Sequence, residues 1–140
     1  MMTPSLIIDC SITMAWCFED ERTEETVRIQ DRLIDEGAIV PVHWELEVAN
    51  VLIMAEKRSR ISTADSMRFL NDLRVFDIQV DNQSSGWIFD HVLSLCRAHG
   101  LTSYDAAYLD LALRRQLPLA TLDDDLRRAA RSLGVKTLGK

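Results

Sequence analysis

Short apolar runs of strand length alternate with longer segments of helical periodicity along the whole chain. We expect strands at residues 6–9, 38–42, 76–80, 117–121 and 135–138, and helices at about 24–36, 43–58, 63–73, 86–99, 104–116 and 124–133. Strands that alternate with long helices form βαβ units, so the pattern predicts a parallel sheet with helices on both faces. No internal repeat or linker-like tract divides the sequence, which predicts a single three-layer α/β domain across residues 1–140.

Four acidic residues occupy positions of this pattern that are otherwise apolar. Asp9 ends the first predicted strand and Asp123 follows the fourth. Both therefore project from the carboxyl edge of the sheet, where open α/β sheets bind their ligands. Glu47 and Asp105 lie on apolar stripes of their predicted helices, and the stripe of Glu47 is predicted to face the sheet. Such positions seldom hold carboxylates without a partner, and no Lys or Arg shares these stripes.

Each of these acids also has a purely structural interpretation. Asp9 can bond its own backbone in a turn, and Asp123 can cap the helix that follows it. Asp105 stands three residues after Thr102, the spacing of a capping box. Glu47 can be a buried glutamate that pairs with a distant arginine. Taken together, however, the predicted fold brings at least two of the four acids to one sheet edge, and such a cluster repels itself unless it holds a cation.

The missing partner that suits such a cluster is a hard divalent ion. Carboxylates and water are the preferred ligands of Mg²⁺ and Mn²⁺, which activate water and stabilise phosphoryl displacement. The predicted metal ligands and catalytic residues are Asp9, Glu47, Asp105 and Asp123. Supporting roles are expected for nearby polar side chains, namely Ser11, Thr121, Asn50 and Asp125. The histidines and cysteines lack the spacing of a zinc site.

Charge and composition narrow the class of protein. The net charge of −6 argues against coating nucleic acid by bulk electrostatics, yet residues 101–140 carry 7 basic and 5 acidic residues. Arginines of this last segment either receive a phosphate-bearing substrate or form solvated helix faces: Arg114, Arg115, Arg127, Arg128 and Arg131. Asp110 is predicted to lie on the polar face of its helix, in an ordinary pair with Arg114.

The cysteines and the N-terminal residues bear on the compartment. Three unpaired cysteines favour a reducing, cytoplasmic environment. The N-terminal residues predict no signal peptide, and no apolar stretch is long enough to predict a membrane span. Trp16 and Phe18, close after Asp9, either pack in the core or flank the site and stack on a base.

Four short motifs, in this order, resemble the PIN-domain family, and most closely its VapC-like ribonuclease toxins. The family's hydrophobic-Asp-x-Ser start resembles residues 8–11, followed by a Trp-Phe-acidic segment at 16–19. Residues 41–52, with Glu47, resemble the helix that carries its second acid. Residues 101–108 resemble its third-acid motif, and residues 119–123 resemble its closing Thr-x-Asp. The resemblance runs nearly end to end.

The resemblance implies a sheet of order 3-2-1-4-5 and a Mg²⁺ or Mn²⁺ site that hydrolyses RNA phosphodiesters. It assigns Asp9, Glu47, Asp105 and Asp123 as the acids of that site. The run of three aspartates at 123–125 leaves open which of them contributes most at the fourth position. Such proteins commonly form homodimers and are held inactive by a cognate antitoxin, so both partners are expected here.

Three other interpretations remain at this stage. Residues 9–13 approximate the Asp-x-Asp-x-Thr of haloacid-dehalogenase-type phosphatases, although Ser11 stands where that chemistry needs its second Asp. A receiver domain also places acids at strand ends, but it requires a Lys that residues 121–123 do not provide. A third alternative is a catalytically weak PIN-like domain whose role is partner binding.

Overall fold

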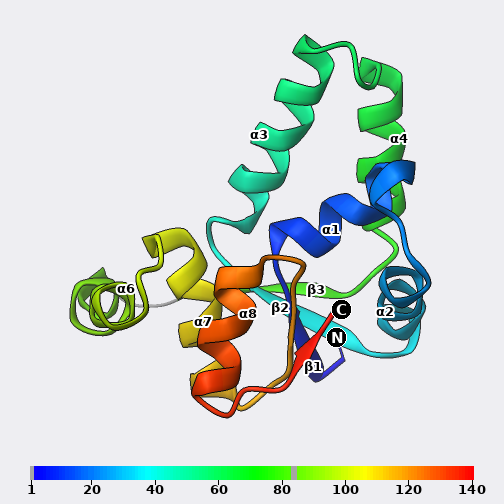
Figure 1. The fold of residues 1–140 in the computed structure, drawn as a ribbon. Helices are drawn as coiled ribbons and strands as arrows, with labels where there is room; N and C mark the ends of the chain where they lie inside the picture. Colours follow the sequence, from blue (N-terminus) through cyan, green and yellow to red (C-terminus); the bar gives the residue numbers. More distant parts are fainter. Residues whose placement is uncertain (1, 83–84) are drawn as a thin grey trace.

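A computed structural model describes residues 2–82 and 85–140. Five parallel strands form one sheet in the order β3-β2-β1-β4-β5 (Figure 1). The strands are β1 (Pro4–Ile8), β2 (Gly37–Pro41), β3 (Ile78–Asp81), β4 (Leu119–Ala120) and β5 (Thr137–Leu138). The predicted parallel sheet, its strand order and its helices on both faces are confirmed.

The helices are α1 (Cys10–Cys17), α2 (Glu24–Asp35), α3 (Trp44–Lys57), α4 (Thr63–Leu73), α5 (Ser85–Trp87), α6 (Leu93–His99), α7 (Ser103–Arg115) and α8 (Asp124–Ser132). A 3₁₀ turn, η1 (Glu19–Glu21), follows α1, and a π-helical turn, η2 (Ile88–Val92), joins α5 to α6. The single helix predicted over 86–99 is therefore interrupted. The ring of Trp87, the last residue of α5, stacks on that of His91 in η2 with centroids 3.6 Å apart.

The central strands form the core because both of their faces are covered. Leu6, Ile7 and Ile8 of β1 have no exposed surface, and all of β2 is buried. Strands buried on both faces read as continuous apolar runs, and this is the pattern that predicts them from sequence. Helix α7 packs against β1, β2 and β4, and α2 packs against β2. The site described below lies at the carboxyl ends of the strands that α7 covers.

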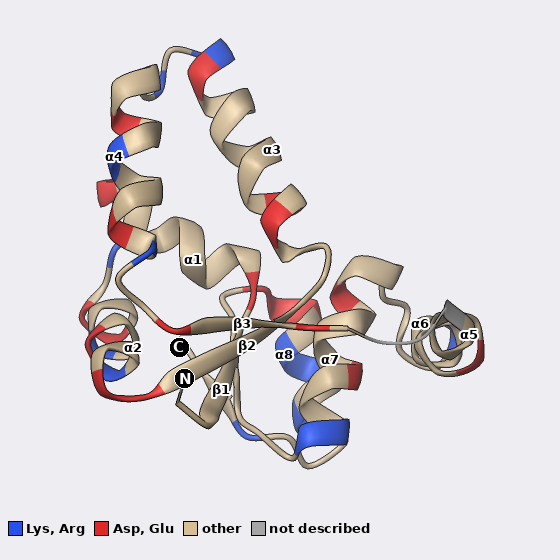
Figure 2. Cartoon of the chain, turned by 180° about the vertical axis from the view of Figure 1, so that it is seen from behind, with Lys and Arg blue, Asp and Glu red and all other residues tan. Residues whose placement is uncertain are grey.

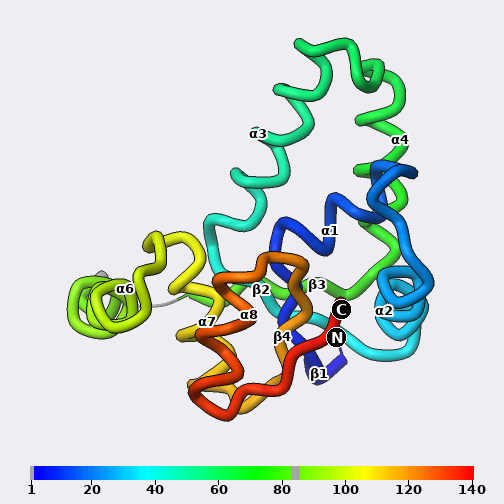
Figure 3. The backbone as a smooth tube through the Cα atoms, viewed as in Figure 1, coloured from blue at the N-terminus to red at the C-terminus, as the bar shows by residue number. Residues whose placement is uncertain are grey.

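Helices α3 and α4 form a hairpin that rises away from the sheet on the side of α1 (Figures 1 and 3). The turn between them is tight. Ser59 has a left-handed backbone with φ of 58°, and the Arg60 amide donates to the Ala55 carbonyl at 2.9 Å. Ser62 then caps α4 in a reciprocal capping box with Asp65. These bonds fix the turn, and with it residues 58–62, over the end of α1.

Candidate active site

A cavity of about 330 Å³ opens at the carboxyl edge of the sheet, between α1, α3 and the first turns of α7 and α8. Acidic segments at the end of β1 and at the starts of α3, α7 and α8 gather around it (Figure 2). Its lining consists of Asp9, Cys10, Ser11, Met14, Phe18, Glu21, Glu47, Val51, Arg60, Asp105, Tyr108 and Asp123. All four predicted acids therefore face one cavity, although they come from four separate segments of the chain.

Asp9 is fixed where β1 passes into α1. It caps α1, with its Oδ1 accepting from the Ile12 amide at 3.0 Å and from the Ser11 hydroxyl at 2.6 Å. Its Oδ2 accepts from the Thr121 hydroxyl. Only 3% of Asp9 is exposed, and this burial raises its pKa to about 6 in spite of the three hydrogen bonds. Ser11 and Thr121, for which supporting roles are predicted, thus each donate to one of the two Asp9 carboxylate oxygens.

Asp123 is held in a similar way at the β4–α8 junction. Its Oδ1 caps α8 by accepting from the Leu126 amide at 2.8 Å, and its own amide donates to the Thr121 hydroxyl oxygen at 3.0 Å. The structural interpretation of Asp123 as a helix cap is thus correct, whereas Asp9 caps a helix where a turn was the structural alternative; both roles coexist with a position in the cavity. A cap orients a carboxylate as firmly as it stabilises a helix.

Arg127 of α8 and Gly139, which follows β5, restrain the backbone of the β4–α8 junction. The guanidinium of Arg127, which is 8% exposed, donates to the backbone carbonyl of Thr121. Gly139 packs so close that an added Cβ would lie 2.5 Å from the same carbonyl oxygen, at a φ of 121°. The Gly139 amide is held by Glu25 at 3.0 Å. Thr121, the link between Asp9 and Asp123, therefore has little freedom to move.

Glu47 lies on the first turns of α3, opposite α7. Its Oε1 accepts from the Tyr108 hydroxyl at 2.5 Å and lies 3.4 Å from Nε2 of His43. The buried stripe of α3 consists of Trp44, Val48, Leu52 and Ala55, so the prediction that Glu47 lies on the buried stripe is wrong. Glu47 is adjacent to that stripe and faces the cavity instead of the sheet.

Asp105 differs from the other acids in its hydrogen bonding. Its amide donates to the Thr102 hydroxyl at 3.2 Å, but the return bond that would complete a capping box is absent from the described residues. Partial burial is the main cause that raises the pKa of Asp105 to about 6, and the charges of Asp123, Asp9 and Glu47 add to it. The capping-box alternative thus accounts for Thr102 and leaves the Asp105 carboxylate unexplained.

The remaining predicted residues lie at the edge of the site or outside it. Asn50 is exposed on α3 and does not line the cavity. Asp125 is exposed and paired with Arg128 at 2.6 Å, and Asp124 is paired with Lys140 at the same distance. Trp16 and Phe18 are each 3% exposed, so core packing is the correct alternative for both, with Phe18 also reaching the cavity wall.

The prediction for Asp110 is wrong in one respect. It pairs with Arg114 at 2.9 Å as expected, but it is 6% exposed and does not lie on a polar face. Both of its oxygens accept from the Trp87 indole, at 3.0 and 2.9 Å. Arg114 also bonds Asp81 at 2.7 Å. Because Trp87 comes from a distant segment, the helical pattern of α7 alone does not reveal this burial.

The arginines of residues 101–140 do not line the acidic cavity. Arg114 and Arg115 contact Asp81, Arg128 contacts Asp125, and Arg127 holds backbone carbonyls. The cationic residue that does line the cavity is Arg60, which has no sequence motif around it.

Tyr108 could be recognised in the sequence only as part of the apolar stripe of its helix. Its phenol donates to Glu47, a bond that raises the pKa of Tyr108 together with burial.

Residues 6–132 match the PIN domain. The chain belongs to the PIN domain family. It is similar to Ribonuclease VapC3 of Pyrobaculum aerophilum, with 28% identity over 121 residues, covering 86% of this chain and 91% of the relative. Membership in this family argues against the phosphatase alternative. Ser11, which donates to Asp9, also stands where that chemistry needs a second carboxylate.

Two solved structures share the fold. The crystal structure of PAE2754 from Pyrobaculum aerophilum has a TM-score of 0.73 and 24% identity, covering 97% of this chain and 92% of that one. A toxin–antitoxin complex from Klebsiella pneumoniae has a TM-score of 0.56 and 18% identity, covering 85% of this chain and 87% of that one.

Within the described residues, no helix combines the length and apolar character needed to cross a bilayer.

Proposed function

We propose that this protein is a Mg²⁺- or Mn²⁺-dependent endoribonuclease and the toxin of a toxin–antitoxin pair. One observation carries the proposal: four carboxylates from β1, α3, α7 and α8 face a single cavity, and two of them have pKa values raised to about 6. Buried acids without compensating charge destabilise a fold, so their retention favours a functional role. The ribonuclease name of the relative from Pyrobaculum aerophilum supports the same assignment.

The donor set suits a hard divalent ion. Every candidate ligand offers carboxylate oxygen, and the site contains no pair of histidines or thiols that would select zinc. As they stand, no three acidic, histidine or cysteine side chains of residues 2–82 and 85–140 form a closed set around one ion. Fewer protein ligands suffice where water and substrate phosphate complete the set, because Mg²⁺ usually retains several waters.

When bound, the ion would supply Lewis-acid charge and an activated water for in-line displacement at phosphorus. The residues of this chain position that chemistry. Ser11 and Thr121 hold both oxygens of Asp9, so its carboxylate keeps one orientation. Tyr108 and His43 both contact Oε1 of Glu47, which leaves Oε2 to face a ligand. Asp105 has the least support from neighbouring donors and is the carboxylate most dependent on a bound cation.

Cleavage of single-stranded RNA tests this function. The protein should cut RNA with Mg²⁺ or Mn²⁺, and a chelator should abolish the activity. Since an activated water attacks phosphorus directly, the products should carry 5′-phosphate and 3′-hydroxyl ends. End groups with 2′,3′-cyclic phosphate would contradict the mechanism, because they require attack by the ribose 2′-hydroxyl.

The toxin assignment adds three expectations: a cognate antitoxin that reaches the acidic cavity, a homodimer and a cytoplasmic location. The similar Klebsiella pneumoniae structure, by its title a toxin–antitoxin complex, supports the first of these. Co-expression with the protein encoded by the adjacent gene tests it. The antitoxin should copurify with this chain and block RNA cleavage, and light scattering of the chain alone should give the mass of a dimer.

A further inference from the structure

Arg60 lies at the mouth of the acidic cavity, in the tight turn between α3 and α4. Its guanidinium carbon stands over the Phe18 ring, 3.7 Å from the ring centre, in a cation–π contact. Of the side chains that line the cavity, Arg60 alone is a lysine or arginine. An anion that enters the cavity next to Arg60 therefore meets the one lysine or arginine of its lining.

The ion pairs of Arg60 leave part of its guanidinium available. It contacts Asp20 at 2.7 Å and Glu21 at 3.0 Å, and both contacts use Nη2. The N–H groups on Nε and Nη1 are not used in either pair, and 39% of the side chain is exposed. Asp20 is 76% exposed, so water screens its attraction to Arg60. A phosphate, which arginine binds in bidentate fashion, can displace such a carboxylate.

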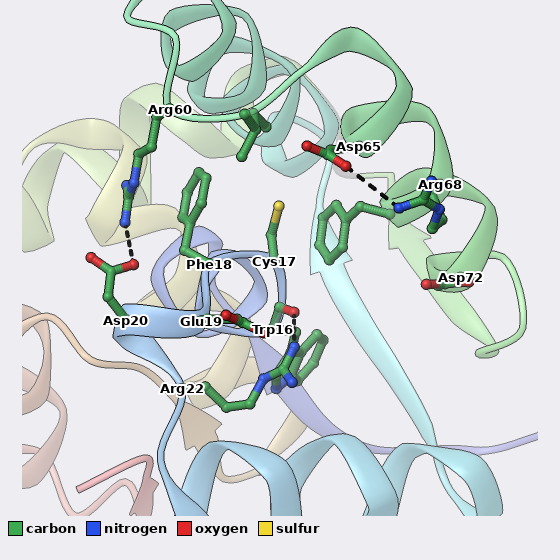
Figure 4. Close-up of a pocket in the computed structure, with 12 residues that line it drawn as sticks. Trp16, Cys17, Phe18, Glu19, Asp20, Arg22, Arg60, Asp65, Arg68 and Asp72 are labelled. Carbon is green, nitrogen blue, oxygen red and sulfur yellow. Dashed lines mark hydrogen bonds and ion pairs between the residues drawn. The ribbon is translucent and has the colours of Figure 1, made fainter.

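Arg60 also forms the boundary between two cavities. On its other side lies a cavity of about 700 Å³ between η1 and α4, lined by aromatic and charged side chains. Figure 4 shows Arg60 beside Phe18 and facing Asp20, with Arg22 and Arg68 farther along the same cavity. A strand of nucleic acid that enters the acidic cavity thus has a path that crosses Arg60 and continues between η1 and α4.

We propose that Arg60 receives a backbone phosphate of the RNA substrate and positions the strand across the acidic cavity, with Asp20 as a competing carboxylate that the phosphate displaces. This rests on the proposed ribonuclease function and assigns its substrate-positioning residue. Arg60 touches the substrate away from the bond that is cut, so its loss weakens binding more than the chemical step. A purely structural Arg60 would instead tie η1 to the α3–α4 turn.

The test compares two matched ion pairs by RNA binding. Arg60 and Asp20 form the test pair, and Arg28 and Glu24, which are 72% and 93% exposed on α2, form the control. A fluorescein-labelled single-stranded RNA of mixed sequence is titrated in chelator at several salt concentrations, and anisotropy gives Kd. Arg60→Gln should weaken binding about tenfold and reduce the slope of log K against log salt by about 0.7, the loss of one phosphate contact. Arg28→Gln should change neither quantity.

The carboxylate variants separate positioning from structure by the sign of the effect. Asp20→Asn removes one of the two carboxylates that pair with Arg60 and should tighten RNA binding about threefold, whereas Glu24→Gln should have no effect. If Asp20→Asn instead weakens binding as Arg60→Gln does, Arg60 is a structural tie and the proposal is wrong. Arg60→Lys keeps the charge and should retain the wild-type salt slope.

The cleavage assay distinguishes the two proposals. With Mg²⁺ present, Arg60→Gln should raise KM about tenfold and leave kcat within about threefold of wild type. An unchanged KM and Kd would overturn the role of Arg60 while the ribonuclease function stands. If wild type neither binds nor cuts RNA, both proposals fall. Circular dichroism melts of each variant confirm that the comparison is made on folded protein.

Discussion

Helix α7 carries two aspartates, Asp105 and Asp110, whose surroundings are opposite. Asp110 is buried but fully matched, with both oxygens bonded to the Trp87 indole and a guanidinium, that of Arg114, at 2.9 Å. Asp105 is less buried, faces three other acids and receives no side-chain donor from the described residues. The fold pairs one carboxylate with a guanidinium and places the other among acids.

The same difference separates the paired acids around Asp110 from the acids of the cavity. Asp110, Asp81, Arg114 and Arg115 form a closed network in which every carboxylate meets a guanidinium. The cavity acids are instead anchored by hydroxyls, backbone amides and a phenol, which orient a carboxylate without removing its charge. Retained charge with fixed orientation is what a divalent ion requires.

The largest effect expected from this contrast is on activity. Asp105→Asn keeps the shape of the side chain and removes its charge, so RNA cleavage should fall by at least about 100-fold. Asp110→Asn, assayed at a temperature where it is folded, should stay within about threefold of wild type. The measurement is the cleavage rate of each variant at saturating Mg²⁺. Equal losses of activity in the two variants would contradict the assignment of Asp105 to the site and Asp110 to the structural network.

Stability should show the reverse order. Asp110→Asn places an amide donor against the donors of Trp87 and Arg114, and it leaves a half-buried guanidinium with one fewer partner. The free energy of unfolding should therefore fall by about 2–4 kcal/mol. Urea unfolding monitored by circular dichroism measures it. A change smaller than about 0.5 kcal/mol would mean that the network does not hold α5 and η2 to α7.

Asp105→Asn should have the opposite sign in metal-free protein. Removing a repelled carboxylate should stabilise the fold by about 0.5–2 kcal/mol at pH 7, seen as a higher Tm in chelator. Asp9→Asn should gain less, because its oxygens already accept from Ser11, Thr121 and the Ile12 amide. A lower Tm for Asp105→Asn would assign Asp105 a structural role.

A smaller effect is expected on the pH dependence of stability. The pKa values of Asp9 and Asp105 are raised from 3.8 to about 6, so the folded protein binds more protons than the unfolded chain between these values. The contribution of these two groups to stability should therefore fall as pH rises from about 4 to 6 and level off above that. In chelator, Asp105→Asn should reduce the dependence of Tm on pH across this range by about 3 °C. An unaltered dependence would contradict the raised pKa of Asp105.

Much of this arrangement could be predicted from the sequence, because it depends on local patterns. Continuous apolar runs predict the buried strands, and the chain order of strands and helices places Asp9 and Asp123 at one edge. Glu47 and Asp105 were singled out as acids among apolar neighbours, although Glu47 lies beside the buried stripe of α3 and not on it. The motifs that resemble the PIN-domain family gave the strand order, and the structure confirms it.

What could not be predicted depends on contacts between distant segments. The burial of Asp110 requires Trp87, and the position of Arg60 over Phe18 requires the α3–α4 hairpin to fold back across α1. The contacts that restrain the Thr121 carbonyl require Gly139 to pack beside β4. None of these residues has a characteristic pattern around it, so only the tertiary structure brings them together.

Calorimetric titration with Mn²⁺ is the most direct test of whether the four cavity acids bind a divalent cation. Wild type and Asp110→Asn should bind Mn²⁺ with the same affinity, because the network around Asp110 is already neutral. Asp105→Asn should bind at least about tenfold more weakly, and binding should decline below pH 6 as the acids take up protons. Equal Mn²⁺ binding by wild type and Asp105→Asn, or no binding by wild type, would contradict the metal site.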